Sequence, residues 1–267
     1  MNPVATMTME QAWPTPKRRQ VGVLDIPLAL LSPGRVFARV ENVASYGWIF
    51  LTLLTVVTMI GWATVQTGLI DRQVAERLAA TEAELEKQHY DIVARSAFRQ
   101  MLEDARKQGE FDLLMSRASH VVARPLYVLA SVLGISALLY GVVALTGKKP
   151  EWHTLMTIVL LACYVDVVQL LVRFVLMWRY ASLDVDDSFG VFVRLLPVAA
   201  NEQAAQTATL VGNCLSGISP FAIWFWVVVS MGLSRTTQLL GWRGRLTCLL
   251  FWMAAVVAKV GIAFAPI

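Results

Sequence analysis

The sequence predicts an all-α integral membrane protein with five transmembrane helices and a water-exposed helical insertion between the first two. Of its 267 residues, 57% are hydrophobic and only 16% are charged, too few charges to cover a soluble domain of this size. The sequence also contains uncharged runs of 29 residues (42–70) and 23 residues (125–147). At about 1.5 Å per residue, either run can cross a hydrocarbon core about 30 Å thick.

The N-terminal 45 residues are predicted to lie outside the bilayer core. Residues 1–25 have a basic cluster and no hydrophobic period, which predicts a disordered cytoplasmic tail. Residues 26–45 are predicted to form an interfacial amphipathic helix, with Ser32 and Pro33 as a strong helix-start signal. A simple linker is the alternative. The apolar face of the expected helix consists of Val36, Phe37, Val40, Val43 and Ala44.

The first span is predicted at 46–70, and the composition changes abruptly after it. Residues 71–118 carry ten acidic and eight basic side chains and no proline, which predicts an extracytoplasmic helical insertion in water. An apolar stripe runs along this insertion. Its members are Leu78, Leu85, Ile92, Phe98, Met101, Leu102 and Ala105.

One apolar stripe on a water-exposed helix needs a covering surface. We expect the insertion to fold back so that its second arm, 111–115, covers the stripe beyond a break at Gln108 and Gly109. Contact with a second copy or with a partner protein is the alternative.

The remaining spans are predicted at 121–146, 154–179, 218–234 and from 246 to the C-terminus, so the membrane domain comprises 46–70 and 121–267. The second span is expected to be broken near its start by Pro125. In order, the N-terminal segment and the turns after the second and fourth spans hold five, two and three Lys or Arg residues. This charge distribution predicts a cytoplasmic N-terminus and an extracytoplasmic C-terminus.

Searches for catalytic motifs give nothing that predicts an enzyme. The sequence has no phosphate-binding loop, dinucleotide fingerprint, zinc-peptidase motif or nucleophile elbow, and its three histidines are far apart. The acidic trio Asp184, Asp186 and Asp187 lacks the pattern of a calcium loop. We therefore predict no catalytic residue, cofactor or metal. The net charge of +4 comes from basic residues flanking the apolar runs, so nucleic acid is not an expected partner.

The third span is unusual because Asp166, Gln169 and Arg173 interrupt it on one face. An ionised residue near mid-bilayer costs about 2.5–3.5 kcal/mol and is seldom left unpaired. Asp166 lies 12 residues past Thr154, and Lys259 lies 13 past Leu246, so both are about 18–20 Å from the same side. We predict an intramembrane Asp166–Lys259 pair. The alternative is that Lys259 extends to the interface while Asp166 meets backbone or water.

Two segments resemble the bacterial branch of the Yip (Ypt-interacting protein) family of membrane proteins. These are LLSPGRVF at 30–37 and ISPFAIWFWVVVSMGLSRTTQLLGWRGRLTCLLFW at 218–252, the second being similar to the family's fourth span, short basic turn and fifth span. The resemblance implies a multipass protein of the bacterial inner membrane without enzymatic chemistry. It also implies a role similar to that of accessory subunits of ABC-type export systems.

The predicted function is that of a non-enzymatic accessory or scaffold subunit of a membrane complex. Its expected partners are the lipid bilayer, other integral membrane proteins such as ABC transporter subunits, and a second copy of the chain. The alternative is a transport subunit that conducts a proton or small solute along the polar face of spans three and five. The sequence shows neither the internal repeat nor the second charge cluster typical of a transporter.

Overall fold

The computed structural model describes residues 21–40, 44, 46–89, 95–183, 185, 188–189, 215, 218–236, 238–239 and 241–263, with side chains except at 88–89, 95 and 259–263. Within these ranges every regular element is a helix, which confirms the all-α class. The elements are α1 (Asp25–Leu31), α2 (Pro33–Phe37), α3 (Gly47–Gln66), α4 (Leu69–His89), α5 (Arg95–Ala118), the π-helical turn η1 (Ser119–Ala123), α6 (Arg124–Leu145), α7 (Trp152–Tyr180), α10 (Pro220–Arg235) and α11 (Trp242–Ala263).

Within the part of the chain that the structure describes, three helices are long and apolar enough to cross a bilayer, which supports a membrane protein. They are α3 with 20 residues, the continuous helix Ser96–Leu145 that contains α6, and α7 with 29 residues. Helix α10 is apolar but shorter. Helices α3 and α6 coincide with the two uncharged runs of the sequence, because a spanning helix must keep its backbone polar groups paired over the whole apolar stretch.

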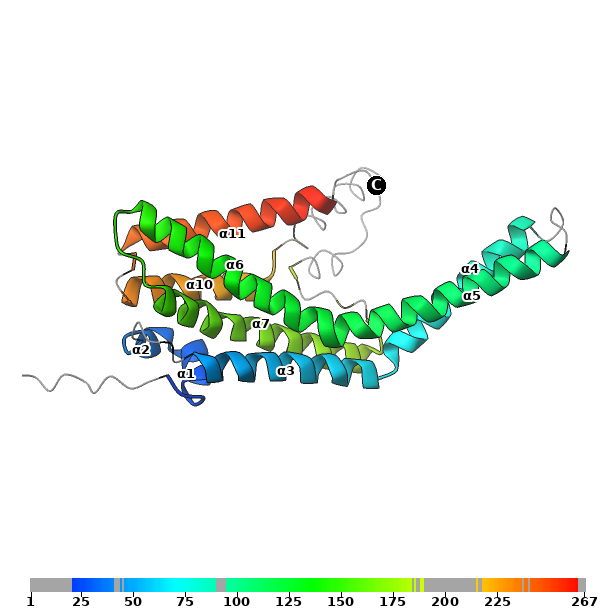
Figure 1. Ribbon diagram of the computed structural model, residues 1–267, viewed down its shortest axis with the longest axis horizontal. Coiled ribbons are helices and arrows are strands. Elements are labelled where there is room, and N and C mark those ends of the chain that lie inside the picture. The colour runs from blue at the N-terminus through cyan, green and yellow to red at the C-terminus, as the bar shows by residue number, and fades with distance from the viewer. Residues whose placement is uncertain are drawn as a thin grey trace, which may run out of the picture.

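Helix α7 is the centre of the bundle. It packs against α3, α6, α10 and α1, and in Figure 1 it runs between them along the long axis of the molecule. Every side chain from Thr154 to Val165 is buried. Helix α11 packs against α10.

The bundle has an α2 end and a hairpin end. At the α2 end, the backbone N–H of Glu151 donates to Gln238 Oε1 at 3.3 Å, and Gly34 of α2 lies beside Arg235 of α10. The turn before α7 and the loop after α10 therefore lie together with the N-terminal helices. The basic residues of these segments are Arg35, Arg39, Lys148, Lys149, Arg235, Arg243 and Arg245.

At the opposite end, α4 and α5 form an antiparallel hairpin that projects away from the bundle (Figure 1). Helix α5 continues through η1 into α6, so the predicted break at Pro125 is wrong. Proline lacks an N–H and its ring collides with the carbonyl four residues earlier in an α-helix. The wider π-helical turn immediately before Pro125 accommodates this conflict without ending the helix.

The predicted break at Gln108 and Gly109 is also wrong, because α5 runs without interruption from Arg95 to Ala118. Gly109 lies inside the helix where Leu78 of α4 packs closely, and an added Cβ would lie 3.3 Å from Leu78 Cδ2. The two arms of the hairpin are therefore α4 and α5. The predicted stripe is divided between them, and its member Ile92 lies outside the described residues.

The N-terminal segment also differs from the single helix expected over 26–45. It forms two short helices, α1 and α2, separated at Ser32, because a residue before proline is disfavoured in the helical conformation. Val36 and Phe37 are buried inside the protein, in the helix that packs against α10. The face expected to contact headgroups is thus partly covered by protein. Of the predicted tail 1–25, residues 1–20 lie outside the described residues, as does Val43. Residues 21–25 are ordered, contrary to the prediction, because Val21 is buried and α1 begins at Asp25.

Candidate functional sites

The polar face of α7 lies in the half of the helix nearest the hairpin end. Asp166, Gln169 and Arg173 are each half-buried and follow the fully buried stretch that ends at Val165. The Nε atom of Arg173 is buried and has no hydrogen-bond partner within the described part of the chain. Arg124, the first residue of α6, lies close enough to Arg173 for the two positive charges to repel each other.

The predicted Asp166–Lys259 pair stays a prediction, because the side chain of Lys259 lies outside the described residues. The backbone of Lys259 is in α11, and α10 packs against both α7 and α11. Equal depths of Asp166 on α7 and Lys259 on α11 do not reveal that α10 packs against both of these helices. Arg124 was not predicted as a neighbour of Arg173 because the two are 49 residues apart and no sequence period joins α6 to α7.

A buried polar link fixes α7 to α3. The hydroxyl of Tyr164 donates to the backbone carbonyl of Ile49 at 2.8 Å and lies 2.5 Å from the hydroxyl of Thr52. Both contacts lie between helices that are packed together, so this link positions α7 rather than forming an open site.

The described residues contain no cluster of three His, Cys, Asp or Glu side chains that could hold a metal ion. His120 is in the π-helical turn, where its Nδ1 lies 2.9 Å from the carbonyl of Ser116. The ring of His153 lies beside that of Tyr46, with centroids 5.8 Å apart and the ring planes tilted by 31°. Asp184, Asp186 and Asp187 lie outside the described residues.

The hairpin is held at its root by an exposed ion pair. Arg117 of α5 donates from Nε and Nη2 to the two carboxylate oxygens of Asp71 at 3.0 and 2.6 Å. Farther out, Arg106 donates to Glu82 at 2.8 Å. These hydrogen bonds raise the pKa of both arginines above the ordinary value, so both stay charged at any pH of interest.

Next to this root, α5 presents an apolar face to solvent. Phe111, Leu114 and Met115 are 55%, 65% and 52% exposed. They lie on one side of the helix at i, i+3 and i+4. We call these three residues the stalk patch. The sequence predicts 111–115 as the arm that covers the stripe, whereas the structure leaves the stalk patch uncovered.

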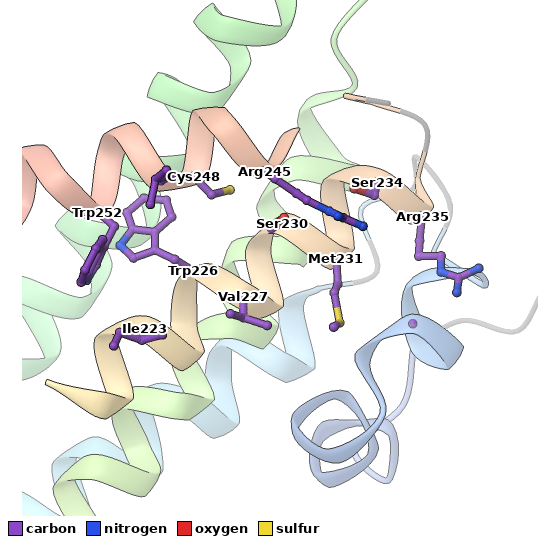
Figure 2. A pocket seen from close by; sticks show the side chains of 12 residues that line it. Ile223, Trp226, Val227, Ser230, Met231, Ser234, Arg235, Arg245, Cys248 and Trp252 are labelled. Carbon is purple, nitrogen blue, oxygen red and sulfur yellow. The ribbon is translucent and has the colours of Figure 1, made fainter. Parts of the chain in front are cut away.

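A pocket of about 580 Å³ lies between α10 and α11 and reaches Gly34 of α2 (Figure 2). Arg235 and Arg245 lie at one end, and Trp226 and Trp252 lie at the other. The sequence indicates only a topological role for these arginines and does not predict the pocket. One signal was present: each helix carries a tryptophan about two turns from its arginine, at spacings of 9 (226 to 235) and 7 (245 to 252) residues.

Comparisons of the chain with protein-family models, with curated proteins and with solved structures give no match.

Proposed function

We propose that this chain is a non-enzymatic scaffold or accessory subunit of a membrane complex, and that the stalk patch is where it contacts another membrane protein. The observation that carries the proposal is the exposure of Phe111, Leu114 and Met115 on a helix that projects from the bundle. An exposed apolar patch in water is a common mark of a protein interface.

The depth of the stalk patch supports a protein contact rather than a lipid contact. Helix α3 is long enough to cross the bilayer and ends at Gln66, and the Arg117–Asp71 ion pair lies just beyond this end. Met115 and Phe111 lie 2 and 6 residues before Arg117 on α5, about 3 and 9 Å farther out along the helix. The Arg117–Asp71 ion pair on the same stretch of the hairpin indicates an aqueous environment there.

The connection between hairpin and bundle supports a scaffold. Helix α5 passes through η1 into α6 as one helix, and η1 packs against α3. A partner bound at the stalk patch would therefore be held at a fixed position relative to the membrane helices. This geometry suits a subunit that orients another protein.

The finer features of the proposal are five spans, a cytoplasmic N-terminus, an extracytoplasmic C-terminus and a bacterial inner membrane location. The gathering of Lys148, Lys149, Arg235 and other basic residues with α2 at one end of the bundle supports this orientation. An ABC-type export system is the kind of complex that the Yip resemblance implies, and a second copy of the chain is the other partner to test. The proposed interface at the stalk patch does not depend on which of these two partners binds there.

The test is a mild-detergent purification of the tagged full chain followed by mass measurement of the intact assembly. The wild type should carry a second membrane protein, or a second copy, in stoichiometric amount. The variant Phe111→Gln/Leu114→Gln/Met115→Gln should lose it while keeping the helical circular dichroism and melting temperature of the wild type. A matched control changes three exposed polar residues of the same helix: Glu103→Gln/Lys107→Gln/Glu110→Gln.

The proposal fails if the wild type is an isolated monomer, or if the stalk-patch variant keeps its partner as well as the control does. Because the substitutions lie on exposed side chains, general unfolding would also contradict the argument.

Transport along the polar face is the second candidate function, and the observation that favours it is the buried, unpartnered Nε of Arg173 within the described chain. A charged group at this depth is often part of a pathway for ions or protons. Asp166→Asn should then leave an assembled protein that no longer moves protons in vesicles, whereas a structural role predicts impaired folding or assembly. Leu171→Ala, at an exposed position on the same helix, is the control because it stays apolar.

A further inference from the structure

The pocket between α10 and α11 has a basic end and an apolar end. Figure 2 shows the side chain of Arg245 reaching from α11 towards Ser234 of α10, with Arg235 beyond it beside α2. At the other end, Trp226 and Trp252 lie close together near Ile223. Trp226 also stacks on Phe251, with ring centroids 5.8 Å apart, and this contact joins α10 to α11.

We propose that this pocket binds one anionic phospholipid, with its phosphate between Arg235 and Arg245 and one acyl chain along Trp226 and Trp252. The site is separate from the stalk patch, so the proposal does not depend on the proposed function.

The charges at the basic end call for an anion. No Asp or Glu lines the pocket, and neither arginine has an ion-pair partner among the residues that the structure describes. Both arginines are exposed at the α2 end of the bundle, and two neighbouring positive charges without a counter-ion attract an anion. The planar guanidinium group of arginine can donate two hydrogen bonds to phosphate oxygens, so it matches a phosphate better than the ammonium group of lysine does.

The length of the pocket matches one leaflet. Ile223 and Arg235 are 12 residues apart on α10, which corresponds to about 18 Å along the helix. Half of a hydrocarbon core about 30 Å thick is about 15 Å. An acyl chain that starts at the arginines would therefore reach the Trp226 end at about the depth where the leaflet ends.

The open side of the pocket supports a lipid over a free anion. Val227, Met231 and Leu249 line the pocket and are about half exposed, so its apolar wall continues onto the outer surface of the two helices. A free phosphate would use only the arginine end and leave this wall without a role. Basic pockets between membrane helices are a recognised place for anionic headgroups.

The probes are dioleoyl-phosphatidylglycerol, dioleoyl-phosphatidylcholine with the same chains, and inorganic phosphate alone. The full-length protein, stripped of lipid in a neutral detergent, is titrated with each probe, and bound species are counted by native mass spectrometry. We expect one phosphatidylglycerol per chain. Phosphatidylcholine should bind about tenfold more weakly because its positive headgroup competes with the arginines, and inorganic phosphate should not displace the bound lipid.

Two variants separate the two ends of the pocket. Arg235→Gln/Arg245→Gln should lower phosphatidylglycerol affinity by about tenfold or more, and Arg235→Lys/Arg245→Lys should recover part of it. Val227→Trp keeps both arginines but fills the apolar wall, and it should also lose the lipid. Arg243→Gln is the matched control, because Arg243 is exposed on α11 and does not line the pocket.

The outcomes are distinct. Equal binding of the two lipids, or wild-type affinity in the double glutamine variant, overturns the headgroup assignment. Displacement of the lipid by inorganic phosphate, or unchanged binding in Val227→Trp, shows a simple anion site and overturns the acyl-chain assignment. A protein chain retained in place of lipid and lost in Val227→Trp overturns the proposal in favour of a protein partner. If the double glutamine variant does not fold, Val227→Trp and the lysine variant provide the test.

Discussion

In the bundle, α3 and η1 meet backbone to backbone at Gly61 and His120, whereas in the hairpin α4 and α5 are joined by the exposed ion pairs Arg117–Asp71 and Arg106–Glu82. Helices in a bilayer gain little from burying apolar surface, because lipid tails are as apolar as the side chains. Close approach at small residues and buried hydrogen bonds must then hold the bundle. In water, charged side chains can lie on the surface of the hairpin without a desolvation cost, although each exposed ion pair contributes little to stability. The same chain thus uses two sets of contacts, and substitutions in the two regions should differ in size.

The largest effect is expected at the closest helix contact. A Cβ atom on Gly61 would collide with the backbone carbonyl of His120, which cannot move without shifting η1. Gly61→Ala should lower the free energy of unfolding by about 3 kcal/mol, the upper part of the range for overpacking. Detergent-mediated unfolding followed by circular dichroism measures this change.

The matched control is Gly134→Ala in α6, where an added Cβ would meet no atom within 4 Å. This substitution should be neutral or slightly stabilising, because alanine favours a helix over glycine. Equal stability of the two variants would contradict the backbone contact between α3 and η1.

A smaller effect is expected where a glycine faces a side chain. A Cβ on Gly232 of α10 would lie 2.6 Å from Cγ2 of Ile158 in α7. A side chain can give way more easily than a backbone, so Gly232→Ala should cost about 1–2 kcal/mol. Ile158→Ala removes both γ carbons that the added Cβ would meet, so the double variant should be less destabilised than the sum of the two single variants predicts. Simple additivity in the unfolding measurements would argue against direct contact.

A still smaller loss of unfolding free energy is expected when the hydroxyl group of Tyr164 is removed. Tyr164→Phe removes the hydrogen bond to the carbonyl of Ile49 and the contact with Thr52. Hydrogen bonds between membrane helices contribute about 0.6–1.7 kcal/mol, so a loss of about 1 kcal/mol is expected. Tyr127→Phe, at an exposed position of α6, should leave the unfolding free energy unchanged. A wild-type result for Tyr164→Phe would show that the hydroxyl is equally well satisfied without α3.

The contacts that carry these effects could not be predicted from the sequence, although the helices could. The bounds of α7 lie within two residues of the predicted 154–179, because a mainly apolar stretch of this length indicates an apolar environment. Gly61 lies within such a run like any other small residue, and only the crossing of α3 and η1 gives it a role. Gly109 was interpreted as a break because glycine disfavours helices in water, but Leu78 on the opposite arm fills the space beside it.

The candidate sites show the same difference between positions along one helix, which the sequence predicts, and contacts between helices, which it does not. The spacing of Asp166, Gln169 and Arg173 placed them correctly on one face of α7, since helical period alone decides that. Arg124 beside Arg173, and the pocket between α10 and α11, depend on which helices pack together. Without a family match, no sequence comparison supplied that information.

The smallest effect on the bundle is expected from the hairpin root, and it completes the comparison. Arg117→Gln removes the two hydrogen bonds to Asp71, but both side chains are nearly half exposed. Water and salt therefore replace most of what is lost, and the melting temperature of the bundle should stay within error of the wild type. The change should be local: backbone amides at the start of α4 and the end of α5 should exchange hydrogen faster. Raising the salt concentration should have the same effect in the wild type and little further effect in the variant.

Because hydrogen bonds to Asp71 raise the pKa of Arg117, its charge persists to a higher pH when folded than when unfolded. Stability from this charge is thus present below the ordinary arginine pKa and is lost only above it, so the difference between variant and wild type should not change between pH 7 and about 10. Arg99→Gln on α5, remote from the root, is the control. A large fall in bundle stability from Arg117→Gln alone would mean that the hairpin and the bundle unfold as one unit and that the contrast between them is wrong.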